Sequence, residues 1–260
     1  MEHGDHVALN YDLDAPLVEC TSIEDWKQKA RGHKVFITPH HMGYQTGYRG
    51  YNWNFFTEGE QTPFVEMYSR HGLAESDQGD YNYLHDMGPR QWEGTIQCGL
   101  EQGKKFGIMG STDQHAGYPG SYGDGRIGIL AESLTRDKIW DAMKNRHVCC
   151  ATGDKINIDF RLNDAFPGDV VRGNSRRIYL NVEGNSCIDY IDIVKNRKCI
   201  ARLSGPLLPE TPEGDTVRCK VKVEFGWNRE EKYVHWQGKL SIDKGQINEV
   251  IPCFRGAAFT

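Results

Sequence analysis

The chain has 260 residues, enough for one large domain or two ordinary ones, and 38% of them are hydrophobic. Its formal net charge is −5 with both signs interspersed, which excludes the basic, clustered surface that nucleic-acid binding needs. No apolar run approaches the roughly 20 residues of a membrane span, so we expect neither nucleic acid nor a membrane as a partner.

Cysteine and histidine, the residue types with the most site chemistry, are distributed differently. The eight cysteines are scattered and form no C-x-x-C pair, which favours reduced thiols and a cytoplasmic location over disulfides or a zinc ribbon. Nine of the ten histidines lie at or before His147. Because histidine is the commonest metal ligand and acid–base group, we expect any site chemistry in this N-terminal part.

The N-terminal part predicts strands and helices in alternation. Apolar runs predict strands over residues 5–10, 34–38, 63–69, 106–109 and 127–130. Helices are predicted over 21–30, where Thr21 and Glu24 have capping-box spacing, over 91–102, and from Thr135 to about residue 146. This alternation is typical of a mostly parallel α/β fold, in which ligands bind at the carboxyl ends of the strands.

From residue 154 onward the pattern changes to a period of two. Strands are predicted over 156–162, 178–182, 188–194, 217–225 and 232–242, separated by turns with Gly, Asn and Pro. This predicts an antiparallel β-sandwich. We therefore expect two domains, an α/β domain over residues 1–153 and a β-sandwich over residues 154–260.

Residues of metal-ligating types follow three of the predicted strands. His40 and His41 follow the strand over 34–38, His71 follows the strand over 63–69, and Asp113 and His115 follow the strand over 106–109. Asp113 and His115 are two residues apart and therefore project to the same side of an extended chain. Carboxylate and imidazole together suit a divalent transition metal, so the sequence predicts a metal site where these strand ends meet.

Four motifs, in this order, resemble the PHP (polymerase and histidinol phosphatase) superfamily of metal-dependent phosphoesterases. They are D-H-V-A-L at 5–9, P-H-H at 39–41, V-E-M-Y-S-R-H-G at 65–72 and G-S-T-D-Q-H at 110–115. The likeness is greatest to a large uncharacterised branch of the superfamily that carries a C-terminal β-sandwich. Features typical of that branch are the segments 48–53, 87–90 and 117–123.

The resemblance implies the C-terminal part of a distorted (β/α)7 barrel, with two or three zinc, manganese or iron ions at the strand ends. The metal ligands that it implies are His6, His40, His41, Glu66, His71, Asp113 and His115. Of these, Glu66 and His71 match ligand positions more loosely, and His41 supports or replaces His40.

The chain departs from the family pattern at its beginning. The H-x-H strand, a further histidine and the G-x-E glutamate of the family are not present, and His3 and His6 have the wrong spacing for H-x-H. We therefore expect an N-terminally truncated fragment that has lost part of its metal ligands. Two outcomes stay open for such a fragment, an active hydrolase and an inactive one.

The expected reaction is hydrolysis of a small-molecule phosphoester by a metal-activated water. Catalytic roles are expected for Asp113, His115, Arg49 and Arg90, with the two arginines, or Arg126, holding the phosphate. The glycine-rich run over 117–128 lacks the G-K-[ST] of a P-loop and is interpreted as a substrate-facing loop.

Two alternatives from other classes stay open. An amidohydrolase-like enzyme acting on C–N bonds would use the same kind of strand-end cluster. A non-catalytic module would instead bind carbohydrate or protein through the sandwich and carry a degenerate barrel that binds metal weakly or not at all. The sequence does not reveal the oligomeric state.

Overall fold

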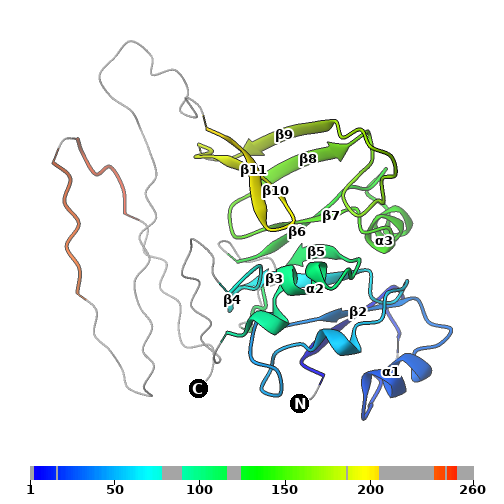
Figure 1. Ribbon diagram of the computed structural model, residues 1–260. Helices are drawn as coiled ribbons and strands as arrows, with labels where there is room; N and C mark the ends of the chain where they lie inside the picture. Colours follow the sequence, from blue (N-terminus) through cyan, green and yellow to red (C-terminus); the bar gives the residue numbers. More distant parts are fainter. Residues whose placement is uncertain are drawn as a thin grey trace. The chain divides into compact units, whose positions relative to one another are not determined.

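The computed structural model describes residues 3–15, 17–77, 90–115, 124–185, 187–204, 237–243 and 245–250 (Figure 1). The helices are α1 (Ile23–Lys29), α2 (Ile96–Glu101), α3 (Arg136–Lys144) and the short 3-10 helices η1 (Trp53–Phe55) and η2 (Trp92–Gly94). The strands are β1 (His6–Asn10), β2 (Val35–Pro39), β3 (Phe64–Ser69), β4 (Gly72–Leu73), β5 (Gly107–Gly110), β6 (Arg126–Ile129), β7 (Val148–Ala151), β8 (Ile156–Leu162), β9 (Ile178–Gly184), β10 (Ile191–Lys195) and β11 (Lys198–Leu203).

Side-chain caps determine where the helices begin. Ser22 caps α1, because its hydroxyl accepts from the Asp25 amide at 3.1 Å. Thr135 caps α3 as predicted. The helix predicted over 91–102 starts only at Ile96, because η2 takes up its first turn and Thr95 then provides the cap. Among the described residues no helix has the length and apolarity to cross a bilayer.

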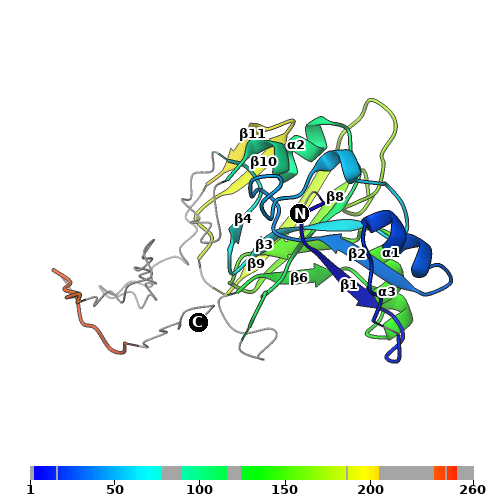
Figure 2. The same cartoon turned by 90° about the horizontal axis from the view of Figure 1, so that it is seen from below.

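The strands of the described residues form small sheets. Strand β1 pairs antiparallel with β2, with His6 opposite Pro39, and β6 pairs antiparallel with β7. A three-stranded sheet has the order β4-β3-β5, in which β3 and β5 are parallel. Strand β2 lies beside β3 (Figure 2). Strand β5 lies beside β6 and β7. The carboxyl ends of β3 and β5 therefore lie together.

The predicted α/β fold, part of a distorted (β/α)7 barrel, is wrong. Helix α1 lies between β1 and β2 along the chain, and α3 lies between β6 and β7, which is the order of a parallel crossover unit. Both strand pairs are nevertheless antiparallel. Apolar periodicity predicts that a strand or helix exists but not the direction in which the next strand runs. The alternation therefore located most of these elements but not the antiparallel direction of these two pairs, whereas β3 and β5 are parallel.

The region after residue 154 consists, where it is described, of paired strands. Strand β8 has the predicted bounds and pairs antiparallel with β9, and β10 pairs with β11. Among the described residues these strands form two two-stranded sheets, β8–β9 and β10–β11. The strand predicted over 217–225 and most of the strand predicted over 232–242 lie outside the described residues.

The chain divides into two compact units. The first contains Met1–Asn185 and Val194–Lys198, and the second contains Ser186–Ile193 and Cys199–Thr260. The boundary predicted between residues 153 and 154 falls inside the first unit, which holds every strand from β1 to β9.

An aromatic cluster forms the largest part of the core of the first unit. The Trp53 ring stacks on Phe106 with ring centroids 4.9 Å apart, and its indole nitrogen donates to the Thr95 carbonyl at 3.0 Å. Tyr51 and Phe56 pack against Trp53 at an angle. A separate cluster joins β2 to α3 through Phe36, which stacks on Trp140 at 3.8 Å. Burial of these rings against β3 and β5 positions the strand ends.

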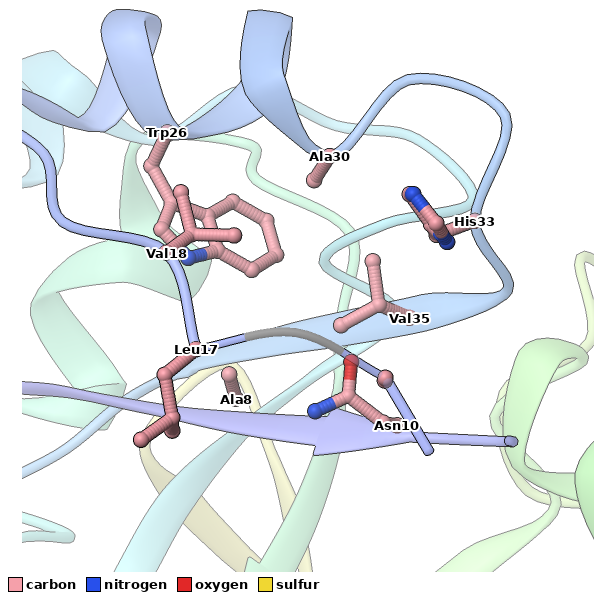
Figure 3. A pocket seen from close by; sticks show the side chains of 9 residues that line it. Ala8, Asn10, Leu17, Val18, Trp26, Ala30, His33 and Val35 are labelled. Atoms are coloured by element: carbon pink, nitrogen blue, oxygen red, sulfur yellow. The ribbon is translucent and has the colours of Figure 1, made fainter. Parts of the chain in front are cut away.

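A small apolar cavity of about 140 Å³ lies between α1 and the β1–β2 pair. Figure 3 shows Trp26 of α1 and Val18 beside Ala8 and Val35 of the two strands. The rest of its lining consists of Asn10, Ala15, Leu17, Ala30 and His33. None of the predicted metal ligands lines this cavity.

Gly99 packs so closely on Trp53 that we expect an alanine at this helical position to destabilise the protein. A helical Gly-to-Ala change ordinarily stabilises a protein by up to about 1 kcal/mol. A Cβ atom at Gly99 would lie 2.4 Å from the Trp53 ring, so we expect Gly99→Ala to lower the free energy of unfolding by about 1–3 kcal/mol. Urea denaturation followed by tryptophan fluorescence measures the change. Gly238→Ala, with open space around it, is the control, and a stabilised Gly99→Ala protein would contradict this packing.

Candidate metal centre

Four histidine side chains converge on the carboxylate of Asp113. The Nε2 atoms of His40, His41 and His71 lie 3.3, 3.9 and 3.2 Å from Oδ2 of Asp113. The Nε2 atom of His115 lies 4.0 Å from the other oxygen, Oδ1. The five residues form two groups of three potential ligands, His40 with His41 and Asp113, and His71 with Asp113 and His115. Asp113 belongs to both groups.

The ends of three strands bring these residues together. His40 and His41 directly follow β2, His71 follows β3 after one residue, and Asp113 and His115 follow β5. Because β3 and β5 are parallel, the residues that follow them meet at the same edge of their sheet. Strand β2 lies beside β3 and adds the first two histidines. Residues predicted to follow three strands are thus brought together, although the strands of the described residues do not form the predicted α/β fold.

Backbone conformation also distinguishes two of these residues. His41 and Asp113 have φ angles of 53° and 47°, in the left-handed region that residues other than glycine seldom adopt. Each such residue costs on the order of 1–3 kcal/mol, and such residues concentrate at functional sites. The neighbouring His71 is held by its backbone, whose carbonyl accepts from the Tyr44 hydroxyl at 3.0 Å.

The site is closed on one side and open on the other. His40, His41 and His71 are buried, with 9%, 7% and 1% of their surfaces exposed. The side chain of His115 is 39% exposed. Solvent and any substrate therefore reach the cluster from the side of His115.

Charge separates the roles of the buried groups. Burial would lower the pKa of His40, but Asp113 and Glu66 outweigh it and raise this pKa to about 10. Burial and the neighbouring His40 lower the pKa of His41, so this imidazole is neutral at pH 7. Burial would raise the pKa of Asp113, but the contact with His40 outweighs it and keeps the carboxylate ionised. A cation that binds here replaces the proton of His40.

The donor set fits a divalent transition metal. Oδ2 of Asp113 is buried and has no directed hydrogen bond among the described residues, although three imidazole nitrogens surround it. A buried acceptor without a hydrogen bond is costly, and a cation would satisfy it. Imidazole nitrogen and carboxylate oxygen are ligands that zinc, manganese and iron accept.

Two further predicted ligands lie near the cluster but in neither group. Oε2 of Glu66 lies 2.8 Å from Nδ1 of His40, on the other nitrogen from Asp113. His6 contacts the Tyr51 ring, and burial lowers its pKa to about 4. Its Nδ1 atom lies 3.2 Å from the carbonyl of Gly4.

The two predicted phosphate-binding arginines have different positions. Arg49 donates to Oδ2 of Asp5 at 3.3 Å, and the same oxygen lies 3.8 Å from Nε2 of His41, so Arg49 borders the cluster. Arg90 donates to the backbone carbonyls of Leu73 and Ser76, which ties down the segment after β4. The residues of the predicted substrate-facing loop from 117 to 123 lie outside the described residues.

Two residues at the site, Asp5 and Ser111, were not predicted from the sequence. Asp5 precedes β1 and meets His41 because the start of one antiparallel strand lies beside the end of its partner. Its carbonyl accepts from the His40 amide at 2.9 Å. Ser111, two residues before Asp113, donates to Glu66. Ser111 could have been predicted from the sequence, because it lies two residues before Asp113 and residues two apart on an extended chain share a side. Asp5 could not, because its position depends on the direction in which β1 pairs with β2.

Comparisons with known proteins show distant relatives. The chain is 26% identical over 160 residues to an uncharacterised protein of Chlamydia pneumoniae, a match that covers 55% of the chain and 26% of the relative. An uncharacterised protein of Chlamydia trachomatis serovar D is 27% identical over 169 residues, covering 56% of the chain and 26% of the relative. The chain thus spans about a quarter of the length of these relatives. No protein family and no solved structure matches the chain.

The shared position of Asp113 predicts its effect on metal binding. Because Asp113 belongs to both ligand groups, we expect Asp113→Asn to reduce bound zinc or manganese more than any single histidine change. The metal content after equilibrium dialysis, determined by elemental analysis, measures this. His33→Ala, in the lining of the apolar cavity, is the control and should keep the wild-type content. Equal metal content in the wild type and Asp113→Asn would contradict the shared ligand.

Proposed function

We propose that the chain is a metal-dependent hydrolase that acts on phosphoesters of small molecules, as its resemblance to the PHP superfamily implies. The observation that carries the proposal is the convergence of four imidazoles on one half-buried carboxylate, in two overlapping ligand groups. Zinc, manganese or iron would be held by His40, His41, His71, Asp113 and His115. Such ions, when bound, supply Lewis acidity and lower the pKa of a water ligand.

The charge of the site favours an anionic substrate. The two ligand groups share a single carboxylate and otherwise consist of imidazoles, which are neutral when they bind a metal. Two divalent cations would therefore leave the site positive even against the neighbouring carboxylates of Glu66 and Asp5. This excess of positive charge suits a phosphoryl group better than a neutral amide.

Arg49 and His115 have the positions of substrate-facing residues. The Arg49 side chain is 35% exposed, borders His41 through Asp5, and carries donors suited to phosphoryl oxygens. His115 forms the exposed side of the cluster. We assign Arg49 to binding the phosphoryl group, and His115 to the open ligand group next to which the substrate binds.

We also propose a reducing compartment such as the cytoplasm. The support is that all six cysteines among the described residues are free thiols, including the buried Cys98.

Hydrolysis of chromogenic esters tests the proposed reaction. We expect the manganese- or zinc-loaded chain to hydrolyse p-nitrophenyl phosphate or its diester, and His115→Ala to lower kcat about 10- to 100-fold. Arg49→Ala should mainly raise KM, by roughly 10-fold, because it removes a charged contact to the substrate. Arg161→Ala, whose guanidinium pairs with Asp159 on β8, is the matched control.

Other outcomes of the same assay would redirect the assignment. Hydrolysis of a p-nitroanilide amide without hydrolysis of either phosphoester would favour an amidohydrolase-like enzyme. A chain that binds metal and hydrolyses neither class would be a binding module. Activity unchanged in His115→Ala would contradict a catalytic role for this cluster.

A further inference from the structure

A buried carboxylate lies behind His40, on the far side of its ring from Asp113. Oε2 of Glu66 is 2.8 Å from Nδ1 of His40, whereas Nε2 of the same ring is 3.3 Å from Asp113. Glu66 lies within β3 and is only 5% exposed. It therefore faces the ring nitrogen that points away from the two ligand groups.

The same oxygen of Glu66 is held by a serine from the next strand. The Ser111 hydroxyl donates to Oε2 of Glu66 at 2.5 Å. Ser111 directly follows β5, and its amide donates to the Tyr68 carbonyl of β3 at 2.9 Å. The β3–β5 register shifts between Glu66 and Tyr68, beside this contact.

Together these contacts surround the imidazole of His40 with Glu66 on one side and the segment from Ser111 to Asp113 on the other. The segment from Ser111 to Asp113 contacts Glu66 through its first residue and Nε2 of His40 through its last. Glu66 in turn contacts Nδ1 of His40. Nδ1 of His40 and Oε2 of Glu66 are close, but their geometry is bent. Among the described residues Nδ1 therefore has no directed hydrogen bond. A carboxylate accepts and does not donate, so the nearby charge of Glu66 favours a proton on Nδ1.

We propose that Glu66 and Ser111 are positioning residues, in which Glu66 holds the Nδ1 proton of His40 so that Nε2 is free for a metal ion, and Ser111 holds Glu66. The inference rests on the proposed metal-dependent function. It replaces the expectation that Glu66 is itself a ligand, because both neighbours of Oε2 are protein donors and Glu66 is in neither ligand group. Outer carboxylates of this kind fix the ring and raise ligand basicity, and their loss typically costs about 10- to 100-fold in metal affinity.

Zinc and cobalt binding by the whole chain test this role without any activity assay. We expect Glu66→Gln to weaken Zn²⁺ affinity, in competition with a chromogenic chelator, about 10- to 100-fold. Ser111→Ala should weaken it less, and Ser111→Thr should restore it because the hydroxyl remains. Thr62→Ala, an equally buried polar residue outside the cluster, should bind as the wild type does.

The Co²⁺ derivative separates a positioning residue from a ligand. With Glu66 outside the ligand set, the visible absorption per bound Co²⁺ should be the same in the wild type and Glu66→Gln. The paramagnetically shifted proton of a metal-bound imidazole N–H should exchange faster with water in Glu66→Gln. Altered absorption that indicates a lost ligand would overturn the inference, and so would Zn²⁺ affinities within twofold of the wild type.

The failure of this inference differs from the failure of the proposed function. A wild-type chain that binds no Zn²⁺ or Co²⁺ would overturn both. A wild-type chain that binds metal with the same affinity as Glu66→Gln and Ser111→Ala would overturn the positioning role alone. If Glu66→Gln does not fold, as judged by circular dichroism, the Ser111→Ala and Ser111→Thr pair decides the question.

Discussion

The contact of Asp113 with the surrounding imidazoles is the interaction on which the site depends. Four histidines from three strand ends lie with their Nε2 atoms within 4.0 Å of the oxygens of this one half-buried carboxylate. Without a counter-charge, so many imidazoles would repel one another when protonated and would be costly to bury. The left-handed backbone at Asp113 and His41 is a further cost that the surrounding structure carries. Residues with such a backbone conformation concentrate at functional sites.

The parallel pair β3–β5 is the constraint that builds this contact. Both strands are buried against an aromatic cluster around Trp53, and their carboxyl ends meet because they run in the same direction. His71 comes shortly after β3 along the chain, and Ser111, Asp113 and His115 come after β5. The antiparallel β1–β2 pair brings Asp5 to the same place as His40 and His41. The parallel pair β3–β5 and the antiparallel pair β1–β2 thus both place residues of the cluster at the carboxyl end of β3.

The sequence predicted the local features better than the architecture. Apolar periodicity located β2, β3, β5 and β8 within a residue or two, and residue type with strand-end position identified His40, His41, His71, Asp113 and His115. Periodicity does not encode strand direction, so the barrel was predicted in error. The role of Glu66 also needed coordinates, because only they show that it faces Nδ1 rather than the ligand groups. Asp5 needed the β1–β2 register.

We propose that imidazoles of this cluster bind a metal ion. X-ray absorption at the zinc edge of the zinc-loaded chain tests it most directly, because imidazole rings give characteristic multiple scattering and sulfur gives a distinct, longer shell. We expect nitrogen and oxygen ligands with strong imidazole scattering and no sulfur. Sulfur ligands, which the free cysteines Cys149 and Cys150 could supply, or zinc without imidazole scattering would contradict it.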